Sequence, residues 1–417
     1  MIQRGNIVKN TVRNSRILGA VILGATLVGS LAGCATPASN GGDSAGGTFT
    51  LWDPYPDRDA SSTWAKAIDA CATEIGVTIK RNAGNTGDTV KDLTTAASNL
   101  PDIAMVDNPK VSTLADAGLL TTTDENGFDV SDISPNILSA GEIDGKVYGV
   151  PVGANTLGLY YNPTVLDAAG VDIASVTDYA SLTAALEKVV ASGKKGITFS
   201  AVGTEEGSFQ FLPWFWGAGA DLTELDSSEA EAALTLWTDW VQKGYAPNSV
   251  ISNTQGTSWD EFKTGEFAFA ENGSWFKGDA DTNGYLSIQV PGIDGGVAPA
   301  PTGGEFITIP VQKDTARYAT SAKIVKCLSE GDTGATALGY VAPTQAGADA
   351  QLASDETLEF WIGAVGDAKP RTADNLGVSY GIISEQLYTA VQAALSGSAS
   401  PADALATAQA AAVENLK

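Results

Sequence analysis

The sequence predicts an α/β fold in which two lobes, each a mainly parallel sheet flanked by helices, are joined by three crossings of the chain. Two observations support this prediction. Residues 48–107 alternate strand-like and helix-like segments, in the order typical of a parallel sheet covered by helices. Three loose joints, within 145–170, 295–311 and 365–375, then interrupt the pattern. Each joint is expected to carry the chain from one lobe to the other.

The amino-terminal elements follow from apolar periodicity. TFTLWD, residues 48–53, is a short strand that ends in an aromatic residue and an acid. Residues 61–76 predict a helix, because Ser61 or Ser62 can cap it and apolar residues recur along one face. The remaining elements expected before the first joint are strand 77–81, helix 89–99 and strand 101–107.

Beyond the first joint the alternation resumes with longer helices. The segment LPWFWGAGAD, 212–221, is expected to form no long helix, because Pro213 and Gly217 interrupt it. The other expected elements are helices 178–192, 228–243, 315–329, 381–396 and 401–416, with strands 197–201 and 266–275.

The amino terminus has the layout of an export signal. Four basic residues precede an uncharged, mostly apolar run from Ile17 to Gly33. The sequence Leu-Ala-Gly-Cys at 31–34 resembles the lipobox of bacterial lipoproteins, in which the cysteine is acylated and becomes the new amino terminus. We therefore predict a signal peptide over 1–33, a lipid anchor at Cys34, and a flexible tether over 34–47 that is poor in large apolar side chains. An ordinary signal peptide or a membrane-spanning anchor are the alternatives.

Composition excludes several functions. The net charge of −25 disfavours nucleic acids and anionic ligands. The chain has no histidine, which removes the commonest general base and metal ligand. No nucleotide-binding loop or CxxC pair is visible either. We therefore expect no catalytic residue, metal or cofactor, although a glycosidase that uses an Asp/Glu pair stays open.

Five stretches in order resemble one protein family. They are PDIAMVD, LADAGLL, GKVYGVPV with LGLYYN, FKTGEFAFAENGSW and GGEFITIP. The order is similar to that of extracellular solute-binding proteins of the maltose-binding type (family 1), which supply sugars to ABC importers. The resemblance implies a two-lobed periplasmic-binding-protein-like fold (type II) that closes on a ligand without turnover. It implies an amino-terminal lobe over 48–152 and 307–365, a carboxyl-terminal lobe over 156–300 and 371–417, and hinges at 153–155, 301–306 and 366–370.

Polar side chains at strand ends are the first candidates for ligand binding, because open α/β sheets bind ligands beyond the carboxyl ends of their strands. Asp53, Asp107 and Asn108 follow two predicted strands, and Asn155 lies at the first hinge, where the family has a polar ligand contact. Carboxylates and amides at such points can pair with vicinal hydroxyls. The alternative is that they turn the chain or cap the next helix.

Aromatic residues are the second group, because their faces stack on sugar rings. Trp275 follows a predicted strand, in a motif where the family carries a stacking tryptophan, and Trp214 or Trp216 is expected to face the cleft. Trp64 lies on the apolar face of its helix and is expected in the core. The weaker candidates are Trp52, Arg371 and Tyr380. Where the maltose binder has a carboxylate beside the hinge this chain has Asn155, so maltose itself is in doubt.

Cys71 and Cys327 both fall on helices assigned to the amino-terminal lobe, and two thiols outside the membrane often pair. We predict a disulfide, with two buried free thiols as the alternative. The whole pattern predicts a lipid-anchored, monomeric binding protein on the extracellular face of a bacterial membrane. Its ligand would be a neutral mono- or oligosaccharide and its partners the permease subunits of an ABC importer. The alternatives are a surface glycosidase and a polyamine-binding protein of the same fold.

Overall fold

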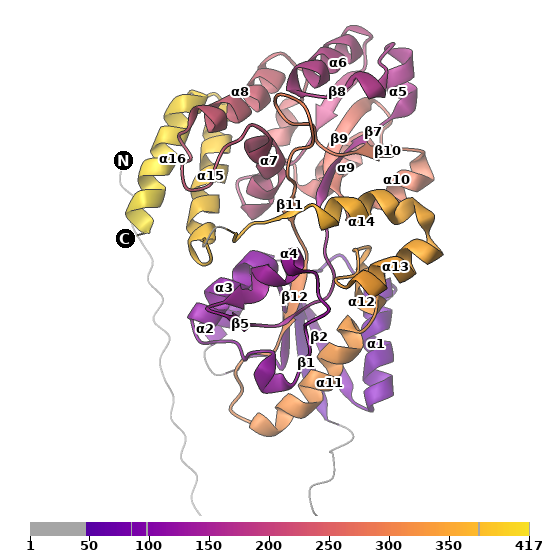
Figure 1. Cartoon of the computed structure of the whole chain (residues 1–417), viewed down its shortest axis with the longest axis vertical. Helices are drawn as coiled ribbons and strands as arrows, with labels where there is room; N and C mark the ends of the chain where they lie inside the picture. The colour runs from indigo at the N-terminus through magenta and orange to yellow at the C-terminus, as the bar shows by residue number, and fades with distance from the viewer. Residues whose placement is uncertain (1–46, 85, 97–98, 374–375, 417) are drawn as a thin grey trace, which may run out of the picture. The chain divides into compact units, whose positions relative to one another are not determined.

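The computed structural model describes residues 47–84, 86–96, 99–373 and 376–416. The predicted signal peptide, the lipidation site Cys34 and nearly all of the predicted tether lie outside the described residues. Within the described ranges, no helix has the length and apolar character needed to cross a membrane. Figure 1 shows α1, α11 and α12 in one region and α5, α6 and α8 in another, each region built on its own sheet.

The sheet of the first lobe has the strand order β2-β1-β3-β12-β6. Its bounds are β1 (Thr48–Asp53), β2 (Thr78–Ala83), β3 (Ile103–Asp107), β6 (Val150–Pro151) and β12 (Glu305–Thr308). β1 runs parallel to β2 and β3, whereas β12 runs antiparallel to both β3 and β6. Burial alternates along β1, with Phe49, Leu51 and Asp53 buried, because successive side chains along a strand point to opposite faces of the sheet.

Helices cover this sheet on both faces. α1 begins after Ser62, whose side chain accepts from the Ala65 backbone N–H, and ends at Gly76, whose φ of 78° suits glycine. Trp64 is fully buried in this lobe, as expected. The helices and short pieces of this region are α1 (Thr63–Ile75), α2 (Thr86–Ala96), α3 (Asn108–Asp116), α4 (Pro135–Leu138), β4 (Glu142–Ile143), β5 (Lys146–Val147), α11 (Tyr318–Ser329), α12 (Thr333–Leu338) and α13 (Gln345–Ser354).

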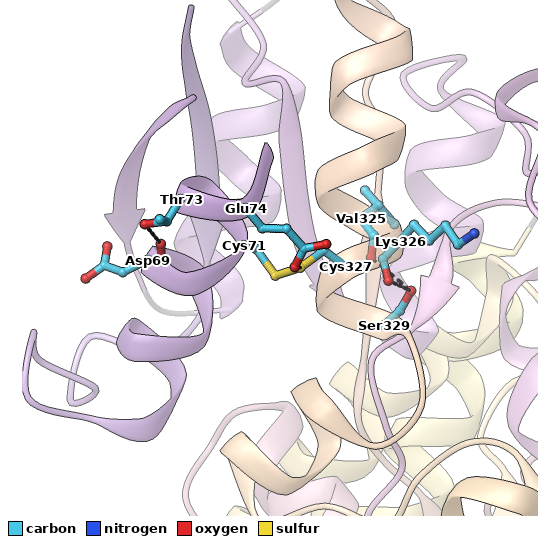
Figure 2. Close-up of a disulfide and its surroundings, with 8 residues drawn as sticks. All are labelled: Asp69, Cys71, Thr73, Glu74, Val325, Lys326, Cys327 and Ser329. Carbon is cyan, nitrogen blue, oxygen red and sulfur yellow. Dashed lines mark hydrogen bonds between the residues drawn. A yellow bond between two sulfur atoms is a disulfide. The ribbon is translucent and has the colours of Figure 1, made fainter. Parts of the chain in front are cut away.

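A disulfide joins α1 to α11. Cys71 and Cys327 are bonded, with Cα atoms 5.8 Å apart, and the predicted pairing is therefore confirmed. Figure 2 shows the bond between the two helices, with Glu74 beside it. The bond links the first and the last part of the chain that build this lobe.

The sheet of the second lobe has the strand order β10-β7-β9-β8. Its bounds are β7 (Leu157–Tyr161), β8 (Lys195–Thr198), β9 (Phe267–Gly273) and β10 (Leu286–Ile288). The helices around it are α5 (Pro163–Ala168), α6 (Tyr179–Ala191), α7 (Glu205–Gly217), α8 (Ser228–Gln242), α9 (Gln255–Phe262), α10 (Lys277–Asn283), α15 (Ser379–Leu395) and α16 (Pro401–Asn415).

The α/β fold class is confirmed, but the sheets are mixed rather than mainly parallel. In the second sheet β8 and β9 are parallel, while β7 runs antiparallel to both β9 and β10. The hinge explains the direction: Leu157, the first residue of β7, pairs with Gly273, the last residue of β9. A strand that enters a sheet at the edge where its neighbour ends must run the opposite way. β12 also enters its sheet from the hinge, and it runs antiparallel to β3 for the same reason.

The helix before the third crossing contacts the second sheet. The sequence assigns residues up to 365 to the first lobe, yet Trp361 of α14 (Glu359–Gly366) packs on Tyr160 of β7, with ring centroids 5.4 Å apart. A Cβ placed on Gly158 of the same strand would lie 3.0 Å from the Trp361 ring. Trp361 thus packs on the second sheet, while the Val365 backbone oxygen of the same helix accepts from Asn136 of α4 in the first lobe, so the boundary at 365 stays a prediction. The short pair β11 (Pro301–Thr302) and β13 (Lys369–Pro370) follows beside it.

Candidate functional site

The carboxyl ends of β1 and β3 meet at one edge of the first sheet, which brings Asp53 and Asp107 to the same side. The Asp53 carboxylate is fully buried and accepts from Trp64 Nε1 at 3.1 Å, Arg81 Nη2 at 2.9 Å and the Tyr55 backbone N–H at 3.1 Å. Both of its oxygens are therefore used within the protein, so its contacts fit a structural role.

Arg371 connects the two lobes through carboxylates. Its side chain is 2% exposed and donates from Nη1 to Asp107 Oδ2 at 3.1 Å and to Glu205 Oε1 at 2.7 Å. Nη2 donates to Asp107 Oδ1 and, at 3.0 Å, to Asn108 Oδ1. Burial alone would lower the pKa of Arg371, but Asp107 and Glu205 raise it, so the guanidinium stays charged. Asp107 ends β3 in the first lobe and Glu205 begins α7 in the second.

Helix α15 completes this network. The Tyr380 hydroxyl donates to Glu205 Oε1 at 2.7 Å, and the Ser384 hydroxyl donates to Glu205 Oε2. Burial, followed by the Glu205 charge, raises the pKa of Tyr380 well above its ordinary value, which keeps the hydroxyl a donor. The structure thus brings the predicted residues Asp107, Asn108, Arg371 and Tyr380 together. Sequence reasoning missed Glu205, whose only local signal is an acid in the first turn of a helix.

Asn155 lies in the first chain crossing between the lobes and pairs with Gly303 of the second crossing. Its backbone exchanges two hydrogen bonds with Gly303, at 3.2 and 2.8 Å. A Cβ on Gly303 would lie 2.1 Å from Asn155 Oδ1, so only glycine leaves room for this side chain. Asn108 Nδ2 donates to the Thr302 backbone oxygen at 3.0 Å. Both predicted asparagines therefore contact the segment 302–303 that connects the lobes.

Trp275 lies beside the hinge, half-buried, in a turn that follows β9. Its ring folds back over Gly273, where a Cβ would come within 2.1 Å of the indole. The Phe209 ring of α7 lies 6.5 Å from the Trp275 ring, and the Arg371 guanidinium lies 4.8 Å from the Phe209 ring. A Cβ on Gly303 would lie 2.9 Å from Phe209. Two aromatic rings of the second lobe are thus placed against the hinge and the arginine.

The other predicted aromatics are not on an open face. Trp214 is fully buried and donates from Nε1 to Glu271 Oε2 at 2.8 Å, and Trp216 is 7% exposed with the Lys369 ammonium 5.1 Å from its ring. The expectation that one of them faces the cleft is wrong, as is the expected interruption by Pro213. α7 runs through Pro213 and is buried on nearly all sides, so packing supports it where periodicity could not reveal it. Trp52 is partly buried against a small apolar cluster of the first lobe.

A second polar cluster was not predicted at all. The Tyr55 hydroxyl donates to Glu305 Oε2 and lies 3.3 Å from the Tyr340 hydroxyl. Burial, followed by the neighbouring Asp107 charge, raises the pKa of Glu305 to about 7. Glu305 follows two hinge glycines at the start of a buried strand, and that unusual placement of an acid was the available signal.

Comparison with known proteins identifies a related family. The sequence profile of the family described as bacterial extracellular solute-binding protein matches residues 66–359. A putative binding protein of Brucella abortus is 26% identical over 177 residues, which make up 40% of this chain and 40% of that relative. The chain thus matches about two fifths of the length of such curated relatives.

Solved structures resemble the chain over most of its length. The cyclic α-maltosyl-1,6-maltose binding protein of Arthrobacter globiformis is 26% identical, with a TM-score of 0.70 over 88% of this chain and 97% of that one. The GacH receptor of Streptomyces glaucescens, studied unliganded and with acarbose, is 23% identical, with a TM-score of 0.75 over 88% and 97%. A solute-binding protein of Thermotoga lettingae bound to α-D-tagatose is 23% identical, with a TM-score of 0.77 over 89% and 100%.

Proposed function

Because the chain belongs to the family of bacterial extracellular solute-binding proteins, we propose that it captures a neutral mono- or oligosaccharide between its lobes for an ABC importer. The observation that carries this proposal is the placement of Trp275 and Phe209 against the hinge, beside hydrogen-bonding side chains from both lobes. An aromatic face next to carboxylates and hydroxyls suits a sugar ring, which has apolar faces and a polar edge.

The charge of the site favours a neutral ligand over an anion. Asp107, Glu205 and Glu305 lie around the Arg371 guanidinium, which already pairs with the first two. A phosphate or carboxylate on the ligand would therefore meet unfavourable charge. The ligands named for the three structural relatives above, acarbose, α-D-tagatose and cyclic maltosyl-maltose, are carbohydrates and support a sugar ligand.

The remaining parts of the proposal concern partners and location. Closure of the lobes around the sugar would present a joined surface to the permease subunits in the membrane. The cysteine at position 34 would hold the monomeric protein on the extracellular face of the membrane through its lipid, with 35–47 as the tether. Binding without turnover is the role we assign to the site.

A thermal-shift panel tests the function. The purified protein is heated with maltose, D-tagatose, acarbose, a uronic acid, an amino acid and spermidine. A ligand at about one hundred times its Kd should stabilise the folded protein by about 2.7 kcal/mol. We expect a shift with at least one neutral sugar and none with the uronic acid. A shift with spermidine alone, or hydrolysis of the sugar during long incubation, would contradict the proposal.

Trp275→Ala tests the stacking surface. A sugar ring on this indole would bury apolar area worth about 1–3 kcal/mol, so affinity should fall roughly tenfold to a hundredfold. Because Trp275 is only half-buried, the melting temperature without ligand should move little. Calorimetric titration measures the first effect and thermal melting the second.

Trp64→Ala is the control for Trp275→Ala. Trp64 is fully buried and bonded to Asp53, so its truncation should cost stability, about 3–5 kcal/mol. If Trp275→Ala unfolds the protein or keeps full affinity, the ring does not stack on the ligand.

A further inference from the structure

Three polar side chains from distant parts of the chain meet at the first residue of β12. Tyr55 comes from the loop after β1, Glu305 begins β12, and Tyr340 lies between α12 and α13. The Tyr55 hydroxyl donates to Glu305 Oε2 and lies 3.3 Å from the Tyr340 hydroxyl. Both tyrosines are held as neutral donors, because burial, followed by the Glu305 charge, raises their pKa values well above the ordinary value. We call these residues the Glu305 cluster.

The strand register places Glu305 beside another acid. Glu305 and Asp107 are directly opposite on the antiparallel strands β12 and β3, so their side chains project from the same face of the sheet. Like charges in that arrangement are destabilising, and Arg371, which pairs with Asp107, offsets part of the repulsion. Two acids placed directly opposite each other destabilise the fold. A purely structural role does not explain Glu305 at this position, which points to a functional role for its carboxylate.

The Glu305 cluster lies against the aromatic pair of the second lobe. Gly339, the residue before Tyr340, is placed so that a Cβ on it would lie 3.8 Å from Trp275 Cα. Gly303, two residues before Glu305, is similarly placed 2.9 Å from the Phe209 ring. The segments that carry the cluster therefore border the Trp275 backbone and the Phe209 ring, so a ligand held by these two aromatic residues would lie beside the cluster.

A carboxylate has about four acceptor positions. The two tyrosine hydroxyls bond to Glu305, which leaves acceptor capacity for further donors. Two adjacent ligand hydroxyls present closely spaced donors that match this remaining capacity.

We propose that Glu305 is a ligand-binding residue, which accepts two vicinal hydroxyls of a neutral sugar while Tyr55 and Tyr340 hold its carboxylate in place. This inference rests on the proposed function and deepens it, because it assigns the selection of a diol to one side chain. It also gives binding a pH dependence. The groups that face Glu305 are Tyr55, Tyr340, Asp107 and Arg371, and burial followed by Asp107 raises the pKa of Glu305 to about 7.

The direction of the pH effect follows from the protonation of the Glu305 carboxylate. A protonated Glu305 loses acceptor capacity, so sugar binding and protonation compete. Affinity should be full above pH 8 and should fall about tenfold per pH unit below 7. Sugar binding should release about one proton near pH 6.

Calorimetric titration from pH 5.5 to 8.5 tests the proposal, with the sugar that gives the largest shift among maltose, D-tagatose and acarbose. Wild-type protein should lose about tenfold in affinity between pH 8 and pH 6. Glu305→Gln should bind at least tenfold more weakly at pH 8 and show a flat profile. Glu271→Gln, a buried acid in the core of the second lobe, is the matched control and should keep the wild-type profile.

Tyr55→Phe provides a second reading that does not depend on the folding of Glu305→Gln. The Tyr55 hydroxyl lowers the pKa of Glu305, so its removal should move the midpoint of the pH profile upward. A flat wild-type profile, or full affinity in Glu305→Gln, would overturn the role of Glu305 while the proposed function stands. If none of the sugars binds wild-type protein at any pH, the proposed function and this inference both fail.

Discussion

The two lobes differ in the interactions that supplement the apolar core of each. The first has a covalent bond between α1 and α11 and two ion pairs at the ends of its strands, Asp53 with Arg81 and Asp102 with Arg317. Burial opposes ionisation of Asp102, but hydrogen bonds from Arg317 and Thr50 lower its pKa. The first lobe thus adds a covalent bond and directional, polar contacts to its buried apolar core.

The second lobe is built around stacked and edge-on aromatic rings. Phe199 lies 4.0 Å from Trp237 in a stacked arrangement, and Trp214 meets Trp240 edge-on at 5.1 Å. All four rings are fully buried. Both lobes have apolar cores, but the lobe that supplies Trp275 and Phe209 contains a dense cluster of aromatic rings, whereas the lobe that supplies Asp107 and Glu305 adds ion pairs and a disulfide. The two should therefore respond to different perturbations.

The largest expected effect is in the aromatic core. Trp237→Ala should lower the free energy of unfolding by about 3–5 kcal/mol, because it removes a ring that contacts both Phe199 and Phe211. Denaturant unfolding measures it. Trp237→Phe is the control: the buried Trp237 Nε1 has no hydrogen-bond partner within the described residues, so this change loses packing alone and should cost less. Equal losses in the two variants would mean that packing does not dominate this core.

Removal of the disulfide should have the next largest effect. Cys71→Ser with Cys327→Ser should cost about 2–5 kcal/mol, because the bond closes a long loop and so restricts the unfolded chain. Denaturant unfolding with and without reductant measures it. Reductant should weaken the wild-type protein and leave the double variant unchanged. If reductant does not change the free energy of unfolding of the wild-type protein, the disulfide does not stabilise the first lobe.

The smallest effect concerns the one acid described inside the aromatic core. Burial raises the pKa of Glu271 well above its ordinary value of 4.5, and the indole hydrogen bond from Trp214 offsets only part of this. The folded protein therefore retains a proton that the unfolded chain releases, so stability should fall as pH rises above 4.5. Glu271→Gln should remove about 1 kcal/mol of that loss between pH 4.5 and 5.5. Identical pH slopes in the two proteins would show that Glu271 is ionised when folded.

The sequence was informative where local pattern and final structure agree. The β-α-β-α-β order of residues 48–107, the burial of Trp64 and the pairing of Cys71 with Cys327 could all be predicted, since each depends on periodicity or residue type. At the site, Asp107, Arg371 and Tyr380 were candidates because they follow strand ends or joints, and they do meet.

What could not be predicted depends on tertiary contacts. α7 has no amphipathic face because it is buried nearly all round, so its tryptophans gave no sign that they belong to the core. Glu205 is an ordinary acid in the sequence and Glu305 is marked only by the two glycines before it, because the surroundings of both arise from Arg371, Asp107 and tyrosines that lie far away along the chain. The direction of β12 likewise follows from the side on which the chain returns to the first sheet.

The bond between Cys71 and Cys327 also sets an order of events. The sequence separation of 256 residues encloses every strand of the second sheet, from β7 to β10, while α15 and α16 lie outside the ring. A chain delivered amino end first presents Cys71 long before its partner, and this thiol must wait unpaired until the second sheet has been delivered. Once closed, the bond makes the second lobe's sheet a loop within a covalent ring. A cut within that ring would then leave the two fragments linked through sulfur, and only a reductant would separate them.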